Sequence, residues 1–161
     1  MIIRAATASD SAVIHDVMIK AFEEYKNETP PSSALEETIQ AVSDALEKGE
    51  KALIAFDEGE PVGMVRFQVK KEDLYFYRLS VLPKKQGDGI GKKIVRALEE
   101  YASRAGVSTI RCKVRLTVPK NQKLYSSIGY ITYDEEVVMK PNGVGIKVIS
   151  MKKVFSAFKE E

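Results

Sequence analysis

Three glycines at alternate positions, Gly87, Gly89 and Gly91, mark the segment of this chain that is best suited to bind an anion. Glycine has no Cβ, so the backbone here can approach a ligand closely and adopt positive φ angles. A helix-like run begins at Ile90, and the first N–H groups of a helix have no intrahelical partner and carry partial positive charge. A bare loop at a helix N-terminus suits phosphate, so the sequence predicts a site for a pyrophosphate-bearing cofactor.

Two of three glycine-rich phosphate-binding templates do not fit this loop. The dinucleotide fingerprint requires a glycine at the sixth position, where a count from Gly87 reaches Lys92. The P-loop requires a hydroxyl residue after Gly-Lys, but Lys93 follows Gly91-Lys92. The remaining template, Gln/Arg-x-x-Gly-x-Gly/Ala, is matched in full by the loop that begins at Gln86.

The elements around the loop form a strand–helix–strand unit. A strand-like run, residues 74–82, precedes the loop and is ended by Pro83, and a helical run follows over residues 90–105. Residues 109–118 then alternate between apolar and charged or polar side chains, as a half-buried strand does. Two strands joined by a helical crossover are parallel, so we expect these two to be parallel neighbours.

The rest of the chain supplies further strands and helices on either side of this unit. Capping-box patterns at residues 7–10 and 33–36 predict two helices, the first running through Tyr25 and the second ending at Gly49. The other expected elements are strands at 1–6, 51–56, 62–69, 131–139 and 144–154, and a short helix from Pro119 to Ile128. This order predicts an α/β (α+β) fold in a single domain, residues 1–161, with a mixed, mostly antiparallel central sheet and helices on both faces.

The composition of the chain argues against several classes of protein and of binding site. The chain has 161 residues, 44% hydrophobic and 30% charged, with a net charge of +2 that is too small to indicate a nucleic-acid partner. The single Cys112 and single His15 leave no disulfide and no metal site of the cysteine or histidine kind. No apolar run has the length of a membrane span, and no signal-peptide pattern opens the chain. We therefore expect a cytoplasmic protein that binds neither membrane nor nucleic acid.

Three segments resemble the GNAT superfamily of N-acetyltransferases. Residues 78–91 are similar to its cofactor-binding strand and loop, and residues 121–130, with Leu124-Tyr125 followed by Gly129-Tyr130, are similar to its Leu-Tyr-x-x-x-Gly-Phe/Tyr segment. Residues 146–154 resemble its final strand. Because the three matches follow the family's order along nearly the whole chain, the chain is identified as a member of that superfamily.

The resemblance implies that the cofactor is acetyl-CoA. Backbone N–H groups of the loop would hold the pyrophosphate, and the strand before it would pair through its main chain with the pantetheine arm, as an added strand does at a sheet edge. The residues implied in cofactor binding are Leu79, Ser80, Val81, Gln86, Gly87, Asp88, Gly89, Ile90, Gly91, Lys92 and Asn121. The alternative for the loop is a glycine-rich turn without a ligand, and for the side chains of Leu79 and Val81 it is plain core.

The resemblance also implies catalytic and binding roles on the short helix. Tyr125 would protonate the departing thiolate, since a thiol with an ordinary pKa of about 8.5 leaves more readily when it is protonated. The alternative is a tyrosine that only packs beneath the helix, and Tyr130 is expected to be core. Asn121 departs from the family pattern because its spacing to Tyr125 is short, so it also fits an ordinary helix N-terminal residue.

The general base is not identified by the sequence. An alkylammonium group with a pKa of about 10.4 must lose a proton before it can attack a thioester. His15 is expected on a solvated helix face. Four carboxylates could serve as a base, although such groups are more often solvated charges; they are Glu23, Glu24, Glu72 and Asp73. Tyr75 and Tyr77 are expected to share a face with Leu79 and Val81, where they would line the acceptor pocket or belong to the core.

The expected function is direct transfer of an acetyl group from acetyl-CoA to a primary amine of a small molecule or peptide, without a metal. Backbone N–H groups of the strand before the loop would polarise the thioester carbonyl. The alternatives are an acyl-CoA-binding sensor without transfer activity, and the same fold with transfer to oxygen or of a longer acyl group. Glu23, Glu24 and Glu28 would suit a cationic amine. The sequence does not decide whether the chain forms a homodimer.

Overall fold

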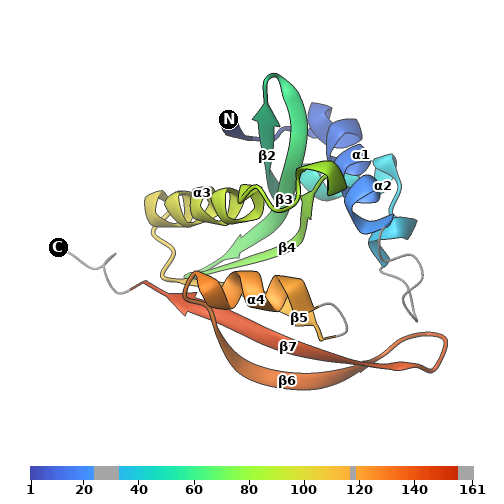
Figure 1. Cartoon of the computed structure of the whole chain (residues 1–161), viewed down its shortest axis with the longest axis vertical. Helices are drawn as coiled ribbons and strands as arrows, with labels where there is room; N and C mark the ends of the chain where they lie inside the picture. The colour runs from blue at the N-terminus through green and yellow to red at the C-terminus, as the bar shows by residue number, and fades with distance from the viewer. Residues whose placement is uncertain (24–32, 117–118, 156–161) are drawn as a thin grey trace. The chain divides into compact units, whose positions relative to one another are not determined.

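The computed structural model describes residues 1–23, 33–116 and 119–155 (Figure 1). Its strands are β1 (Ile2–Ala5), β2 (Lys51–Asp57), β3 (Glu60–Lys70), β4 (Asp73–Val81), β5 (Thr109–Arg115), β6 (Ile131–Met139) and β7 (Gly145–Val154). Its α-helices are α1 (Ser11–Phe22), α2 (Ile39–Glu47), α3 (Ile90–Arg104) and α4 (Pro119–Ser127), and short 3-10 turns lie at Ala8–Asp10, Ser33–Glu36 and Pro83–Lys85. Helices and strands thus follow the order expected from the sequence, with small shifts of their ends.

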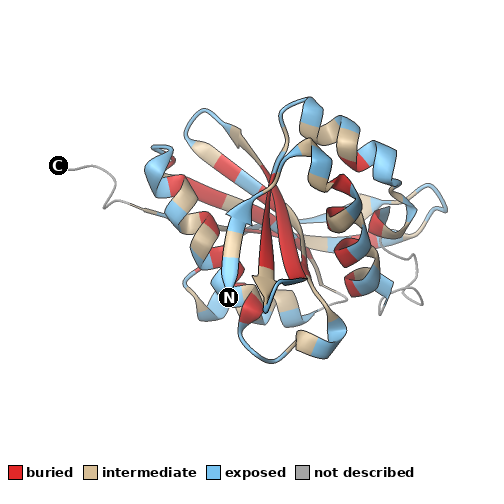
Figure 2. Cartoon of the chain, turned by 90° about the horizontal axis from the view of Figure 1, so that it is seen from above, coloured by how far each residue is buried: buried red, intermediate tan, exposed pale blue. Residues whose placement is uncertain are grey.

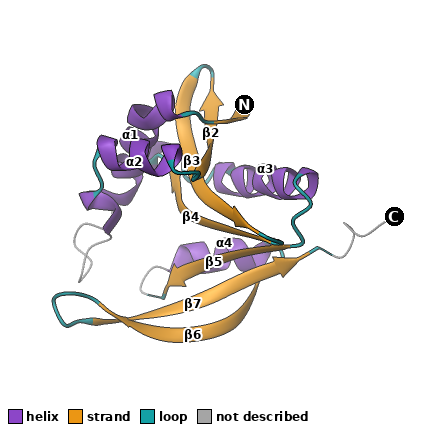
Figure 3. Ribbon diagram, turned by 180° about the vertical axis from the view of Figure 1, so that it is seen from behind, coloured by secondary structure: helices purple, strands orange, loops and turns teal. Residues whose placement is uncertain are grey.

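The strands form one mixed sheet in the order β1-β2-β3-β4-β5-β7-β6 (Figure 3). Strands β4 and β5 pair in parallel, which confirms the expected strand–helix–strand crossover. The pairings β1–β2, β2–β3, β5–β7 and β6–β7 are antiparallel. The expectation of a mixed, mostly antiparallel sheet is therefore confirmed.

The chain divides into two compact units. The first unit comprises Met1–Gln68 and Tyr77–Leu98, and the second comprises Val69–Phe76 and Glu99–Glu161. Three elements, β3, β4 and α3, contribute residues to both units.

Helices cover both faces of the strands in the first unit. On one face, Ile54 of β2 lies opposite Met64 of β3, and both belong to a buried cluster that includes Met18 of α1 and Val42 of α2. Gly63, the residue before Met64 in β3, faces the other way, and a Cβ there would lie 2.8 Å from Cδ1 of Ile94 in α3. The buried residues of these strands are drawn red in Figure 2. Helices on both faces are therefore confirmed for this unit.

Strands β5 and β7 pair in the second unit, and consecutive side chains on each strand point to opposite faces of the sheet. Ile110, Cys112 and Val114 of β5 are buried, as the apolar and charged alternation predicted. The end strand β6 is exposed along nearly its whole length, including the side chains of Val137 and Met139.

Two expected boundaries are wrong. The second helix does not start at a capping box at Ser33; instead, α2 begins at Ile39 because the Thr38 hydroxyl accepts a hydrogen bond of 3.0 Å from the Ala41 N–H. The strand expected to run to residue 118 ends at Arg115, and residues 117–118 lie outside the described part of the chain.

The capping box before the first helix is confirmed. The backbone N–H of Thr7 donates to Oδ2 of Asp10 at 2.8 Å, and the helix that follows is α1. Its expected continuation to Tyr25 lies outside the described residues.

Candidate functional site

The glycine-rich loop leads directly into the N-terminus of α3. Gly87 and Gly89 have φ angles of +91° and +79°, which glycine adopts at little cost. The N–H of Lys93 donates to the carbonyl of Gly89 at 3.1 Å, and this is the first i to i−4 bond of the helix. The N–H groups of Ile90, Gly91 and Lys92 precede that bond and have no intrahelical partner. The chain therefore presents a row of amide donors at this end of α3.

The two loop glycines face open space. A Cβ added to Gly87 or Gly89 would meet no atom within 4 Å, so packing alone does not require glycine at either position. Gly87, Asp88, Gly89 and Lys92 are exposed, Gln86 and Gly91 are half-buried, and Ile90 is buried. Because the Ile90 side chain belongs to the core, only its backbone can serve a ligand. The arrangement fits a phosphate group, which needs donors and room for close approach.

The strand before the loop is attached to it by a side chain. Nε2 of Gln86 donates to the carbonyl of Val81 at 3.2 Å, which ties the loop to the end of β4. Ser80 is buried and its hydroxyl donates to the Arg78 carbonyl at 2.9 Å, whereas Leu79 and Val81 are half-buried. The residues expected to bind the cofactor from β4 and from the loop thus lie together in the first unit.

The alternation expected along β4 is interrupted at Arg78. This residue has a φ of +57°, which is left-handed backbone inside a strand. A regular strand sends consecutive side chains to opposite faces, so the expected common face of Tyr77, Leu79 and Val81 does not continue through this point. The sequence carries no sign of this, because arginine rarely adopts such a φ.

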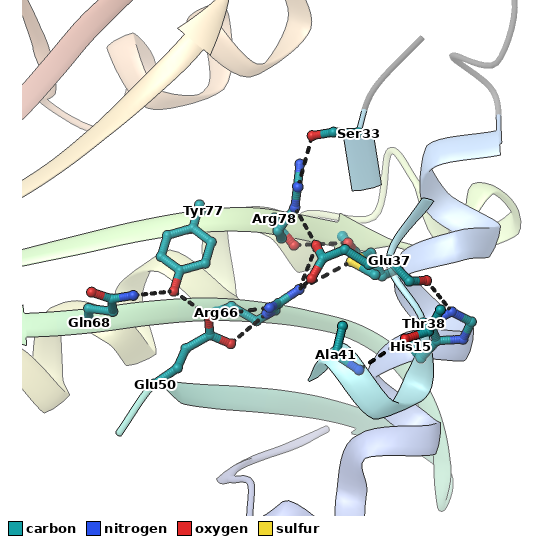
Figure 4. A network of polar contacts seen from close by, with 12 residues as sticks. His15, Ser33, Glu37, Thr38, Ala41, Glu50, Arg66, Gln68, Tyr77 and Arg78 are labelled. Atoms are coloured by element: carbon teal, nitrogen blue, oxygen red, sulfur yellow. Dashed lines mark hydrogen bonds and ion pairs between the residues drawn. The ribbon is translucent and has the colours of Figure 1, made fainter. Parts of the chain in front are cut away.

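A buried ion-pair cluster that the sequence analysis missed lies beside this part of β4 (Figure 4). Arg66 of β3 donates from Nε to Glu50 at 2.6 Å and from Nη1 to both carboxylate oxygens of Glu37 at 2.9 Å. Nε of Arg78 donates to Glu37 at 3.0 Å, and the Tyr77 hydroxyl donates to Glu50. One signal was available, since Arg66 interrupts an otherwise apolar strand pattern; its two carboxylate partners are distant in the sequence.

The cluster shifts the ionisation of its members. Burial, together with the Glu50 carboxylate, raises the pKa of Tyr77 well above its usual value and keeps this phenol neutral. Burial of Arg66 opposes its charge, but Glu50 and Glu37 more than offset this and raise its pKa. The two carboxylates are therefore engaged by arginines, which makes them poor candidates for the general base.

Tyr125 lies in the second unit, buried among aromatic side chains. Its side chain is 3% exposed, and its ring packs edge-on against Phe76 with ring centroids 5.3 Å apart. Asn121 is half-buried in the first turn of α4, the helix that carries Tyr125. Tyr130 is also 3% exposed, and its hydroxyl donates to Glu99 at 2.9 Å, so its expected place in the core is confirmed.

The other titratable groups singled out in the sequence have varied surroundings. His15 is half-buried with Nε2 2.8 Å from the Glu37 carbonyl, so the expectation of a solvated surface histidine is wrong. Asp73 pairs with Arg111 at 3.4 Å, and Glu23 and Glu72 are exposed. Glu24 and Glu28 lie outside the described residues.

Cys112 is inert core, as expected. It is 4% exposed, and burial raises the pKa of its thiol to about 12, so no thiolate forms near neutral pH. Among the described residues, no group of three or more His, Cys, Asp or Glu side chains is placed to hold a metal ion. None of the helices in that part of the chain is both long and apolar enough to span a membrane.

Comparison with known proteins covers nearly the whole chain. A family model described as an acetyltransferase (GNAT) domain matches residues 6–155. The ribosomal-protein-S18-alanine N-acetyltransferase from Escherichia coli is 17% identical, with a TM-score of 0.80 over 99% of this chain and 97% of that one. The ribosomal-protein-alanine N-acetyltransferase from Brucella melitensis is 22% identical, with a TM-score of 0.74 over 96% of this chain and 100% of that one. The protein yncA from Salmonella typhimurium, described as a putative acetyltransferase with its cofactor acetyl-CoA, is 19% identical, with a TM-score of 0.74 over 100% of this chain and 95% of that one. No curated protein gives a significant match.

These findings establish fold and family by different routes. The solved structures have low sequence identity to this chain and establish its fold, whereas the family model matches most of its length. The superfamily indicated by the sequence motifs is confirmed: the chain belongs to the GNAT acetyltransferase family and is an acyltransferase.

Proposed function

We propose that this acyltransferase uses acetyl-CoA and transfers its acetyl group directly to a primary amine of a small molecule or peptide. The observation that carries the proposal is the loop at residues 86–91, in which Gly87 and Gly89 adopt positive φ in open space at the N-terminus of α3. A plain turn does not need such a row of accessible amide donors. Membership of an acetyltransferase family, and a solved structural neighbour described with acetyl-CoA, support the choice of ligand.

The residues of the first unit fit the parts of this ligand. Amide groups at the start of α3 would bind the pyrophosphate, with Lys92 adding positive charge. The backbone of Leu79, Ser80 and Val81 would pair with the pantetheine arm and polarise the thioester carbonyl. Asn121 of α4 is the further residue assigned to cofactor binding. Acetyl-CoA supplies an activated acetyl group, so no metal is needed.

Tyr125 is the residue that we assign to proton donation. Its phenolic hydroxyl would give a proton to the sulfur as the carbon–sulfur bond breaks and the amine nitrogen bonds to the acetyl carbon. The carboxylates of Glu37 and Glu50 are held by arginines, so the base that deprotonates the amine is to be sought elsewhere. Two of the solved neighbours are named for alanine of a ribosomal protein, which keeps a peptide amine among the candidate acceptors.

The second candidate is an acyl-CoA-binding sensor without transfer activity. It would keep the loop unchanged, so binding alone does not separate it from the enzyme. The presence of Tyr125 at the position of the family's proton donor favours the enzyme. Release of free thiol in the presence of an amine separates the two functions.

The test pairs Gly89→Glu with a matched control, Gly59→Glu. Gly59 lies in the β2–β3 turn with a φ of +81°, and a Cβ there also meets no atom within 4 Å. Both variants therefore place the same charged side chain on the same kind of backbone, but only Gly89→Glu places it in the loop. We expect calorimetric titration to show that the unaltered chain and Gly59→Glu bind acetyl-CoA and that Gly89→Glu does not.

Thiol release with a panel of amines completes the experiment. An amine that releases thiol identifies the acceptor class and supports the enzyme. Binding without thiol release from any amine would favour the sensor. Equal affinity of Gly89→Glu and Gly59→Glu would show that the loop is not the binding site.

A further inference from the structure

Arg78 is unusual among the non-glycine residues with positive φ. The structure describes three of these, and two of them, Glu58 and Lys71, lie in the turns between β2 and β3 and between β3 and β4. Arg78 has a φ of +57° inside β4, where no turn requires it. Left-handed backbone is unfavourable for a residue with a Cβ, so surrounding contacts must hold Arg78 in this conformation.

The side chain of Arg78 supplies such contacts. Its Nε donates to Oε1 of Glu37 at 3.0 Å, and its Nη2 donates to the Ser33 hydroxyl at 3.1 Å. Glu37 is in turn held by Nη1 of Arg66, whose side chain is only 4% exposed and is anchored on Glu50 (Figure 4). Arg78 therefore binds a carboxylate whose own position is fixed by a buried arginine.

The direction of the Arg78 side chain depends on its backbone conformation. The Tyr77 hydroxyl donates to Glu50, and Arg78 binds Glu37, so two consecutive residues of β4 reach the same cluster around Arg66. In a regular strand consecutive side chains point to opposite faces. Extended backbone at Arg78 would turn its side chain away from Glu37, so the ion pair and the left-handed backbone stabilise each other.

We propose that Arg78 is a positioning residue for the cofactor-binding strand. Its ion pair with Glu37 holds the left-handed backbone at residue 78 and so sets the orientation of the peptide groups of Leu79, Ser80 and Val81. The buried Ser80 hydroxyl donates to the Arg78 carbonyl at 2.9 Å, which carries the same constraint along the strand. The inference rests on the proposed function, which assigns these peptide groups to the pantetheine arm and the thioester carbonyl.

The test compares Arg78→Ala with Arg78→Gly. Both variants remove the ion pair, but glycine adopts left-handed backbone readily and alanine does not. We expect Arg78→Ala to weaken acetyl-CoA binding about fivefold or more, and Arg78→Gly to recover most of that loss. Lys71, with a φ of +58° in the β3–β4 turn, is the matched control: Lys71→Ala and Lys71→Gly should both bind acetyl-CoA as the unaltered chain does.

Affinity is measured by calorimetry below the melting temperature of each variant, with circular dichroism confirming that each is folded. A role in stability alone would leave the affinity of the folded variants unchanged, so equal affinity of Arg78→Ala, Arg78→Gly and the unaltered chain would overturn the inference while leaving the proposed function intact. Arg78→Gly binding as weakly as Arg78→Ala would also overturn it. Absence of acetyl-CoA binding by the unaltered chain would overturn the proposed function and this inference together.

Discussion

Two tyrosines of the second unit, Tyr125 and Tyr130, are equally buried and pack against the same phenylalanine. Both are 3% exposed, and both rings approach Phe76 edge-on, with centroids 5.3 Å and 6.2 Å away. The Tyr130 hydroxyl donates to Glu99, and burial, with the nearby carboxylate, raises its pKa far above the usual range. Tyr130 is thereby a structural residue, which makes it a control for the proton donor that we propose at Tyr125.

We expect Tyr125→Phe to lower kcat by about 10² to 10⁴ while acetyl-CoA affinity stays unchanged. Phenylalanine keeps the ring that packs on Phe76 and removes only the hydroxyl group that would donate the proton, and a positioned general acid contributes a factor of this size. Steady-state kinetics and calorimetry on the same preparations measure both quantities.

The control variant, Tyr130→Phe, should show the opposite pattern. Loss of a hydrogen bond to the Glu99 carboxylate should lower the free energy of unfolding by about 1.5–3 kcal/mol, with kcat unchanged. A kcat for Tyr125→Phe equal to that of the unaltered chain would remove Tyr125 from the chemistry.

At the scale of elements, the start of α1 is stabilised by charged and polar contacts among the residues that precede this helix. Asp10 accepts from the Thr7 N–H at 2.8 Å and pairs with Arg4 of β1 at 3.0 Å, so the carboxylate links the first strand to the helix start. The hydrogen bond from Arg4 is the main reason that the pKa of Asp10 falls to about 2. A carboxyl group with a lowered pKa contributes stability above its unfolded pKa and loses it as the pH falls towards the folded value.

We therefore expect Asp10→Asn to be less stable than the unaltered chain at pH 7, by about 1 kcal/mol given how exposed Arg4 is. The difference should shrink as the pH falls below about 4, the pKa of an unfolded aspartate, and should be lost near pH 2. Urea unfolding at a series of pH values measures it. A difference that stays constant across this range would mean that the Asp10 charge contributes nothing to stability.

Elements could be predicted from the sequence where neighbouring residues determine them, and could not where residues distant in the sequence determine them. Neighbouring residues determine the glycine loop before α3 and the strands of alternating pattern, and the sequence predicts the positions of both. The start of α2 was predicted wrongly because two capping residues lie close together, and Thr38 rather than Ser33 caps the helix. The cluster of Arg66 with Glu37 and Glu50 could not be predicted, since it joins residues from separate elements that meet only in the folded chain.

At the scale of the whole molecule, the division into two units raises the question of whether the chain unfolds in one step. The sequence led us to expect a single domain, and β3, β4 and α3 each contribute residues to both units. Unfolding one unit alone would have to end a strand or helix in the middle of its hydrogen-bonded run.

We expect a single cooperative unfolding transition. Calorimetry should give a calorimetric enthalpy equal to the van't Hoff enthalpy, as a two-state domain does. Two resolved transitions, or a calorimetric enthalpy well above the van't Hoff value, would show instead that the two units are independent domains.

Gly63 limits how this chain can vary through evolution. A Cβ there would lie 2.8 Å from Ile94 of α3 and 3.0 Å from the Ser80 carbonyl of β4, and the backbone carbonyl cannot rotate away as a side-chain end can. Any substitution of Gly63 by another residue would therefore place a Cβ too close both to the helix that begins at the glycine loop and to the strand that we assign to the pantetheine arm. Gly87 and Gly89 have room for a side chain, so substitution there is limited by backbone conformation and by the ligand that we propose for this loop. Descendants of this sequence should thus keep Gly63 even where cofactor binding has been lost.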